Sequence, residues 1–324
     1  MNIGIIGLGS IGRKHAQIIQ EIGGHKVYAL RSNRGSLTST SENLSFVNQI
    51  FSKKEFIQID LDGLLICTPT HLHSPNLIEF AHLEIPVLVE KPLSHSFIAI
   101  PSLSDSYRRK IKVAFCLRFH PIVNKVKSLI ESGKIGKVLK ANLTVGQYLP
   151  TWHPYTDYRN EYFSKSSMGG GALRTLSHEL DLALHWFGPF TELSGVINKL
   201  SNLEIDVDDN TFILSKHKSG AFINMTIDFL SPKIKRFGYI LCEKGEIHYD
   251  MITSSLSINY YHKDKSESIP TPKNEMYTTQ MKDFLTFINH EPSLAASFSE
   301  AEHIMKVIDV AEQSSLQSKT IQII

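Results

Sequence analysis

The chain begins with MNIGIIGLGSIGRKH (residues 1–15), and this stretch decides the fold of the N-terminal domain. The apolar run of residues 3–6 predicts a buried strand, and a helical pattern of apolar residues starts after Ser10. Between them Gly7, Gly9 and Gly12 stand at the spacing G-x-G-x-x-G. The first glycine permits a tight turn, the second lets a pyrophosphate approach the backbone, and the third allows helix and strand to pack closely. Glycines also collect in ordinary turns, but the flanking strand and helix favour a dinucleotide-binding loop of Gly7, Gly9, Ser10, Ile11 and Gly12.

Length and composition predict an ordinary globular protein of two domains. The 324 residues are many for one core, and 42% hydrophobic with 20% charged residues is a soluble balance. The net charge of +2 argues neither for nor against nucleic acid. Three widely spaced cysteines, Cys67, Cys116 and Cys242, predict free thiols in a reducing compartment. Without a membrane-length apolar run or room for a secretory signal, we expect a cytoplasmic protein with no membrane or nucleic-acid partner.

The end of the second predicted strand, Lys26–Leu30, bears on the choice of cofactor. Folds of this type that bind NAD usually place Asp or Glu about 20 residues beyond the glycines, on the ribose 2′-hydroxyl. Here the segment has Arg31, Ser32 and Arg34 and no carboxylate. These side chains suit the 2′-phosphate of NADP, so we expect NADP(H) over NAD(H). The alternative is a polar surface loop whose arginines face water.

Polar residues come directly after three further predicted strands. Leu61–Cys67 leads into Thr68, Pro69 and His73, Pro86–Val89 leads into Glu90, Lys91 and Pro92, and Val113–Leu117 leads into Arg118, Phe119 and His120. Strands alternating with helices predict a parallel, doubly wound sheet, whose strand C-termini are where ligands bind. His71 and His73 could suggest a metal pair, but no third ligand lies nearby and we expect no metal.

The pattern changes near residue 120, so we expect domains of residues 1–119 and 120–324. A helix is predicted over Pro121–Ser132, and further helices over 275–289 and 299–317. Several β-rich segments joined by short turns predict a largely antiparallel sheet with one face open to a partner, and residues 319–324 add a final strand. The β-rich segments are 138–148, 193–199, 211–216, 221–229, 237–242, 246–249 and 255–261.

A predicted helix over Ala172–Phe187 comes after three glycines and carries titratable residues. At about 100° per residue, leucines and other apolar side chains form one stripe, while Arg174, His178, Asp181 and His185 form another. A solvated face is the alternative, although such faces usually carry Lys and Glu. His178 is the candidate for proton transfer because its ordinary pKa lies near neutrality. Asp181 orients it, or pairs with Arg174 or His185.

Together these motifs resemble the Gfo/Idh/MocA oxidoreductases over essentially the whole chain. The resemblance rests on the glycine motif, Thr68-Pro69 with His73, Glu90-Lys91-Pro92, Arg118-Phe119 and the segment from Gly169 to His178 and Asp181. It implies a Rossmann domain, a C-terminal α/β domain whose open sheet makes a homodimer or homotetramer, and hydride transfer between NAD(P) and a sugar, cyclitol or sugar nucleotide. The family's catalytic lysine and histidine map onto Lys91 and His178. Its cofactor contacts map onto Cys67, Thr68, Pro69, His73, Glu90, Lys91 and Arg118.

Two departures from the family pattern stand out. The Asp that usually precedes the histidine by three or four residues is Thr175 here, and Cys116 stands where Asn is frequent. A loop with Tyr148, Trp152, Tyr158 and Arg159 is similar to a subgroup associated with bacterial surface sugars. These aromatic and basic side chains suit sugar stacking and acid recognition, or else pack on the domain. The expected substrate contacts are Lys91, Tyr148, Trp152, Tyr158, Arg159, Arg174, Thr175 and His178.

The expected chemistry is acid–base catalysis of hydride transfer at a secondary alcohol or ketone. Lys91, partly desolvated near a positively charged nicotinamide, is a plausible base with a lowered pKa, and His178 hydrogen-bonds a neighbouring hydroxyl or shares the proton. Two other functions stay open: a non-catalytic NAD(P)-binding sensor, which Lys91 and His178 argue against and Thr175 keeps open, and a sugar hydrolase or lyase that retains its cofactor.

Overall fold

The computed structural model describes residues 1–324 except 33–43, 153, 155, 262, 269–273 and 324. These residues divide by their contacts into two compact units. Unit 1 comprises Met1–Ser94, Ile98–Cys116 and Asn274–Ala301, and unit 2 comprises His95–Phe97, Leu117–Lys273 and Glu302–Ile324. The division differs from a single boundary near residue 119, because unit 1 also takes in residues 274–301.

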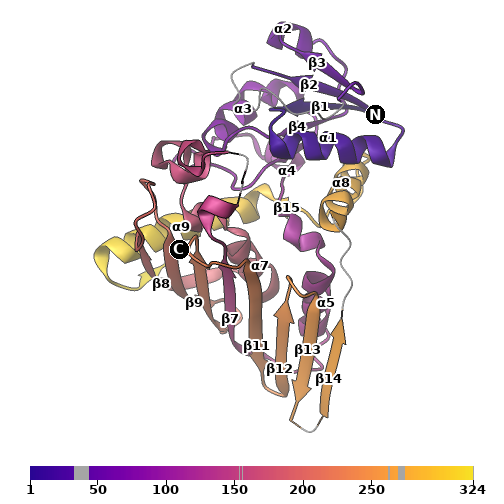
Figure 1. The fold of residues 1–324 in the computed structure, drawn as a ribbon. Helices are drawn as coiled ribbons and strands as arrows, with labels where there is room; N and C mark the ends of the chain where they lie inside the picture. The colour runs from indigo at the N-terminus through magenta and orange to yellow at the C-terminus, as the bar shows by residue number, and fades with distance from the viewer. Residues whose placement is uncertain (33–43, 153, 155, 262, 269–273, 324) are drawn as a thin grey trace. The chain divides into compact units, whose positions relative to one another are not determined.

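Within the described residues, unit 1 contains a seven-stranded sheet in the order β15-β6-β5-β4-β1-β2-β3 (Figure 1). All neighbours are parallel except the edge pair β15–β6, which confirms the predicted parallel sheet. The strands are β1 (Asn2–Ile6), β2 (Lys26–Leu30), β3 (Val47–Ile50), β4 (Gly63–Ile66), β5 (Val87–Val89), β6 (Ile111–Val113) and β15 (Ala296–Ser297). The helices are α1 (Ser10–Ile22), α2 (Lys53–Phe56), α3 (His73–Glu79), α4 (Asp105–Lys110) and α8 (Glu275–Ile288).

The core of unit 1 explains why a late segment joins an early domain. Ile3 and Ile5 of β1 and Ile19 of α1 are fully buried in one hydrophobic cluster. Met281 and Phe284 of α8 belong to the same cluster, and helices α1 and α8 pack against each other. The apolar face of α8 is therefore buried in unit 1, although most of unit 2 separates α8 from β6 in the sequence.

One predicted strand of unit 1 is replaced by a turn and a short helix. The predicted strand Val113–Leu117 is wrong: β6 ends at Val113, and the amide of Phe115 bonds the Val113 carbonyl at 2.8 Å in a turn. The 3₁₀ helix η3 (Cys116–Phe119) comes next. These residues are apolar because they are buried, and burial does not distinguish a turn from a strand. After β4, the 3₁₀ helix η1 (Thr70–Leu72) runs directly into α3.

Unit 2 is built on a nine-stranded sheet, counted over the residues that the structure describes, in the order β14-β13-β12-β11-β7-β10-β9-β8-β16 (Figure 1). β7 and β10 pair in parallel and the other neighbours pair antiparallel, which confirms a mainly antiparallel sheet. The polar strand β14 was not predicted, because its sequence KDKSES has no apolar alternation. The strands are β7 (Val138–Gly146), β8 (Phe190–Asn198), β9 (Asn210–His217), β10 (Phe222–Asp228), β11 (Lys235–Cys242), β12 (Gly245–Asp250), β13 (Ser255–Tyr260), β14 (Lys263–Ser268) and β16 (Ile321–Gln322).

The helices of unit 2 include the segment expected to carry the catalytic histidine. α5 (Pro121–Glu131) agrees with the predicted helix, and α9 (Phe298–Gln317) continues into unit 2 from Glu302. The single helix predicted over Ala172–Phe187 is wrong. The chain forms α6 (Ala172–Thr175) and α7 (His178–Phe187), with Leu176 at φ −100° and ψ 28° between them. Arg174 therefore belongs to α6, whereas His178, Asp181 and His185 belong to α7. Because the helix is interrupted between them, the spacing of about 100° per residue does not place Arg174 on the same face as the other three.

Candidate active site

The glycine loop of unit 1 has the shape that a dinucleotide requires. Gly7 has a φ of +91°, and a Cβ there would lie 2.9 Å from the carbonyl oxygen of Cys67. A Cβ on Gly12 would overlap the carbonyl of Gly7, whereas a Cβ on Gly9 would meet no atom within 4 Å. Gly7 and Gly12 thus serve close packing, and Gly9 faces open space. α1 has no acidic residue in its first turn and no side-chain N-cap, so its amides suit an anion.

The turn after β4 lies beside this loop and is held by hydrogen bonds. The side-chain amide of Asn76 donates from Nδ2 to the Thr68 hydroxyl at 2.9 Å. The ring nitrogens of His73 lie 2.8 Å from the carbonyl oxygens of Thr68 and Pro92. Burial lowers the pKa of His73, while these two acceptors oppose that shift. Burial raises the pKa of the Cys67 thiol, with a smaller contribution from Glu90, so Cys67 is a packing residue beside the loop.

Lys91 comes after β5 at the same carboxyl edge of the sheet. Its neighbour Glu90 is joined to β4 by a backbone bond to Ile66 at 2.9 Å. One carboxylate oxygen of Glu90 lies 2.9 Å from Nε2 of His15, which is 1% exposed. Sequence reasoning missed His15, although it lies three residues after Gly12 on the face of α1 that packs inward. A polar residue at such a position needs a buried partner, which is the signal that could have found it.

The residues expected to select NADP are only partly described. Arg31 donates from Nη1 to the side-chain oxygen of Gln49 at 2.7 Å, and its amide bonds the Ile50 carbonyl. Arg31 therefore lies at the end of β2, next to β3. Ser32 is the next residue, and Arg34 lies outside the described residues.

In unit 2 two acidic residues of α7 are held by ion pairs with arginines that the sequence did not predict. Arg118, expected at the cofactor, makes a bidentate pair with Asp181, with N–O distances of 2.8–3.1 Å. Both side chains are almost fully buried, at 3% and 1% exposure. The predicted alternatives for Asp181 were His178, Arg174 and His185. The ion pair with Arg118 joins Asp181 to a residue 63 positions away that was not among them.

A second buried pair flanks the first on α7. Glu179 accepts from Arg236 of β11 at 2.8 Å, and its side chain is 2% exposed. Nearby, Nδ1 of His120 accepts from the amide of Ile122 and caps α5. Burial, together with the charge of Arg236, lowers the pKa of His120 to about 4. The first turn of α7 is thereby fixed by two ion pairs directly after His178, which begins the helix and is 8% exposed.

The turn that leads into α6 is clamped by Asp208. The Asp208 carboxylate accepts from the amide of Leu173 at 2.9 Å, and a Cβ on Gly171 would overlap it. Burial raises the pKa of Asp208 to about 6. Arg174, expected at the substrate, pairs with Glu312 and donates to the His95 carbonyl at 3.1 Å. Thr175 is 2% exposed.

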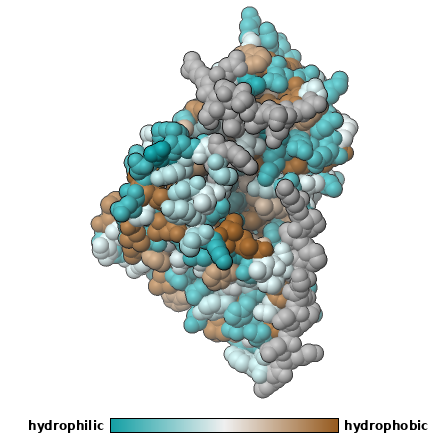
Figure 2. Space-filling model, in the orientation of Figure 1, coloured by the Kyte–Doolittle hydropathy of each residue, from teal (hydrophilic) through white to brown (hydrophobic). Residues whose placement is uncertain are grey.

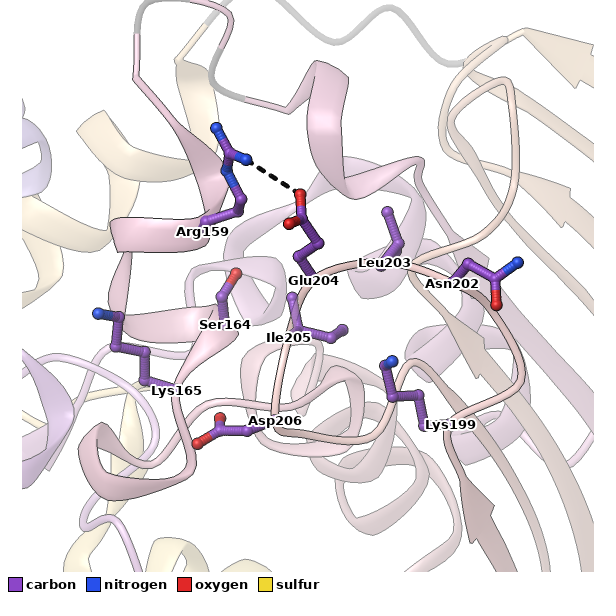
Figure 3. Close-up of a pocket in the computed structure, with 9 residues that line it drawn as sticks. All are labelled: Arg159, Ser164, Lys165, Lys199, Asn202, Leu203, Glu204, Ile205 and Asp206. Atoms are coloured by element: carbon purple, nitrogen blue, oxygen red, sulfur yellow. Dashed lines mark hydrogen bonds and ion pairs between the residues drawn. The ribbon is translucent and has the colours of Figure 1, made fainter.

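The aromatic and basic loop residues lie apart from α7 in sequence, and one of them, Arg159, lines a pocket of about 560 Å³. Trp152 stacks on Phe163, with ring centroids 5.5 Å apart, and so packs on the domain, whereas Tyr148 is 38% exposed. Arg159 pairs with Asp157 and Glu204, and the Tyr158 hydroxyl accepts from the Glu204 amide. Figure 3 shows Arg159 reaching Glu204 across the pocket, with the ammonium groups of Lys165 and Lys199 on opposite sides. The pocket is lined by Arg159, Ser164, Lys165, Lys199, Asn202, Leu203, Glu204, Ile205 and Asp206.

Metal-binding clusters and membrane-spanning helices are both absent from the described part of the chain. No group of three or more His, Cys, Asp or Glu side chains among the described residues could hold a metal ion. No helix in the described ranges is long and apolar enough to cross a membrane.

The strand β1, the glycine loop at its carboxyl end and the helix α1 that follows define, within a parallel sheet, a dinucleotide-binding protein of the Rossmann type. Residues 1–116 match the family model described as oxidoreductase family, NAD-binding Rossmann fold, and residues 123–248 match the GFO/IDH/MocA C-terminal domain. The chain belongs to the Gfo/Idh/MocA family of oxidoreductases, as the sequence motifs indicated.

Curated relatives and solved structures agree with this assignment. The chain is 29% identical to myo-inositol 2-dehydrogenase of Thermotoga maritima over 231 residues, which are 68% of this chain and 66% of that one. Alignments with two further relatives cover 53% and 43% of their lengths. It is 24% identical to oxidoreductase P35 of Formosa agariphila, over 96% of this chain and 98% of the relative. A levoglucosan dehydrogenase in complex with NADH and L-sorbose has the same fold, with a TM-score of 0.87 at 19% identity, covering 100% and 99% of the two chains.

Proposed function

We propose that this protein is an NADP(H)-dependent oxidoreductase that acts on a secondary alcohol or ketone carbon of a sugar, cyclitol or sugar nucleotide. The observation that carries the proposal is Lys91, which comes after β5 at the sheet edge where the open glycine loop also lies. Relatives named as myo-inositol and levoglucosan dehydrogenases support the substrate class. The loop bearing Tyr148 and Tyr158 supports a bacterial surface sugar, and the three buried free cysteines support a cytoplasmic location.

In this proposal Lys91 moves the proton. The bound nicotinamide supplies the hydride acceptor or donor. As a neutral amine Lys91 takes the proton from the substrate hydroxyl during oxidation, and as an ammonium it returns a proton to the oxygen during reduction. His178 hydrogen-bonds a neighbouring substrate hydroxyl or shares the proton. The backbone amides of Gly9 and of the start of α1 would hold the pyrophosphate of the cofactor.

The Lys91→Ala variant tests the catalytic assignment. We expect NADPH to bind as before while turnover falls by ~10²-fold or more, the usual contribution of a general acid or base. Lys53→Ala, which removes an exposed lysine paired with Glu79, is the matched control. Unchanged turnover in Lys91→Ala overturns the assignment, and full activity in His178→Asn reduces His178 to a structural residue.

The NADP preference rests on Arg31 at the end of β2, where NAD-binding folds carry a carboxylate. Titrations with NADPH and NADH, monitored by nicotinamide fluorescence, should give tighter binding of NADPH. Arg31→Asp should reverse the order, because a carboxylate repels the 2′-phosphate. Lys26→Ala changes a charge at the other end of the same strand and serves as the control. Equal or tighter binding of NADH by the unaltered protein refutes the preference.

The proposed oligomer uses the open face of the sheet in unit 2. Val196 of β8 is opposite Phe212 of β9, and Leu214 lies two residues further along; these side chains are 54%, 45% and 52% exposed. Figure 2 shows hydrophobic residues reaching the surface over this part of the molecule. A second copy would bury such a face in a homodimer or homotetramer. Sedimentation of Phe212→Asp should then give a monomer, and a monomeric unaltered protein contradicts the proposal.

A non-catalytic NAD(P)-binding sensor is the second candidate. Thr175, almost fully buried in α6, stands where the family pattern has a carboxylate, and this observation favours it. Incubation with NADPH and a panel of keto sugars separates the candidates. A fall in nicotinamide absorbance supports the enzyme, and binding without turnover across the panel supports the sensor.

A further inference from the structure

Two buried histidines from different helices bond the residues on either side of Lys91. His15 of α1 lies with Nε2 2.9 Å from a carboxylate oxygen of Glu90. His73 of α3 lies with Nδ1 2.8 Å from the carbonyl oxygen of Pro92. Both histidines are 1% exposed. The segment Glu90-Lys91-Pro92 is thus held at both ends inside unit 1.

The two oxygens of Glu90 serve different partners. One accepts from His15, and because an ionised carboxylate only accepts, Nε2 of His15 carries the proton. The other accepts from the backbone amide of Lys91 at 3.3 Å. Since the Glu90 amide is also bonded to Ile66 of β4, the backbone that enters Lys91 is fixed by strand and side chain together.

On the other side, His73 joins Pro92 to the turn after β4. Its Nε2 lies 2.8 Å from the carbonyl oxygen of Thr68, in addition to the contact of Nδ1 with Pro92. The imidazole of His73 therefore lies between the end of β4 and the residue after Lys91; a neutral ring donates to one of the two carbonyl oxygens, and a charged ring donates to both. The Thr68 turn also contacts the glycine loop, since Gly7 packs on Cys67 and Thr68.

This arrangement matters because lysine is a flexible side chain on four methylene groups. Its ammonium can be placed reproducibly only if the backbone that bears it is fixed. A misplacement of about 1 Å at a reacting group can lower a rate by ~10²-fold. The groups that fix residues 90 and 92 therefore bear on the rate without touching the substrate.

We propose that His15 and His73 are positioning residues for Lys91, His15 acting through Glu90 and His73 through Pro92. The inference rests on the proposed role of Lys91 in proton transfer. It predicts that removing either imidazole lowers kcat and leaves cofactor affinity unchanged.

The experiment compares His15→Leu, His15→Gln and Glu90→Gln with the unaltered protein. His15→Leu should lower kcat by ~10-fold or more, with unchanged KM and unchanged NADPH affinity measured by fluorescence. His15→Gln keeps a side-chain amide that can donate to Glu90 and should recover part of the loss. The double variant His15→Leu/Glu90→Gln should be no slower than the slower single variant, because both act on one contact. His73→Leu should give the same split between kcat and affinity.

A measurement without cofactor or substrate completes the test. The ¹⁵N NMR signal of His15 in the free protein should show a protonated Nε2, and this signal should shift in Glu90→Gln. Asn48→Ala removes a part-buried hydrogen bond to Val27 of the same sheet and is the control for general loss of structure. It should leave kcat unchanged.

The outcomes are distinguishable. Unchanged kcat in His15→Leu, or losses that add in the double variant, overturns the inference even when Lys91→Ala is inactive. Full activity of Lys91→Ala overturns the proposed function itself. If His15→Leu fails to fold, Glu90→Gln carries the test, because it conserves volume: an unchanged kcat in that variant refutes the inference and a lowered kcat supports it.

Discussion

The carboxyl edge of the sheet in unit 1 and the α6–α7 segment of unit 2 position their functional residues in different ways. At the sheet edge, Lys91 and the glycine loop directly follow the carboxyl ends of parallel strands. Backbone hydrogen bonds to neighbouring strands hold these segments in place. In α7, His178 stands beside two acidic residues of the same helix that are each buried against an arginine. Those arginines lie 63 and 57 residues from their partners in the sequence.

The difference predicts that substitutions in the two regions affect different properties of the protein. Changes at the sheet edge can alter a ligand contact while the fold stays intact, since Gly9 faces open space. Changes in α7 leave a buried charge without its partner, and such a charge has a high desolvation cost. Variants of α7 should therefore lose stability, whereas variants of the open loop should lose affinity.

Asp181→Ala should lower the free energy of unfolding by about 3–5 kcal/mol, because it leaves the buried guanidinium of Arg118 without its carboxylate. Urea unfolding measures the loss. The double variant Arg118→Met/Asp181→Leu should recover most of it, since a buried ion pair can often be replaced by apolar residues. A single variant as stable as the unaltered protein would show that the pair contributes little to the fold.

The same contrast explains which features the sequence predicts. The glycine motif and the residues after β4 and β5 are local patterns, so the fold of unit 1 and the place of Lys91 can be predicted from neighbours in the chain. The Arg118–Asp181 and Arg174–Glu312 pairs join residues 63 and 138 positions apart, and sequence spacing does not show which opposite charges meet. The break at Leu176 was missed because only two residues separate α6 from α7, and the spacing of apolar residues does not reveal so short an interruption. His15 was missed because its partner Glu90 is 75 residues away.

Gly12→Ala and Gly9→Ala should separate packing from ligand contact within the glycine loop. A Cβ on Gly12 overlaps the Gly7 carbonyl, so the helix has to move. We expect a loss of about 3 kcal/mol, the upper end for overpacking, because the obstacle is backbone. Gly9→Ala should unfold like the unaltered protein but bind NADPH more weakly. Equal stability of the two variants would contradict the packing role of Gly12.

His120→Asn should weaken the dependence of stability on pH. The folded pKa of His120 is about 4 against an ordinary 6.5, so the unfolded chain binds this proton at higher pH than the folded chain. Stability is therefore lost as pH falls from about 6.5 towards 4, by about 2 kcal/mol at pH 5. Asparagine can cap α5 without titrating, so the variant should lose less stability between pH 7 and pH 5. Identical pH profiles would exclude this contribution.

Arg159→Ala should have the smallest effect on folding, although Arg159 pairs with two carboxylates. Its guanidinium pairs with Asp157 and Glu204, and all three side chains are at least 39% exposed. Water solvates these charges and salt screens them, so the pairs add little to the fold. We expect no measurable change in urea unfolding at either low or high salt. A loss comparable with that of Asp181→Ala would mean that the number of ion pairs, rather than their burial, decides stability in unit 2. If Arg159 also recognises an acidic sugar, the same variant should raise KM at unchanged stability, which is the behaviour expected of the sheet edge and not of α7.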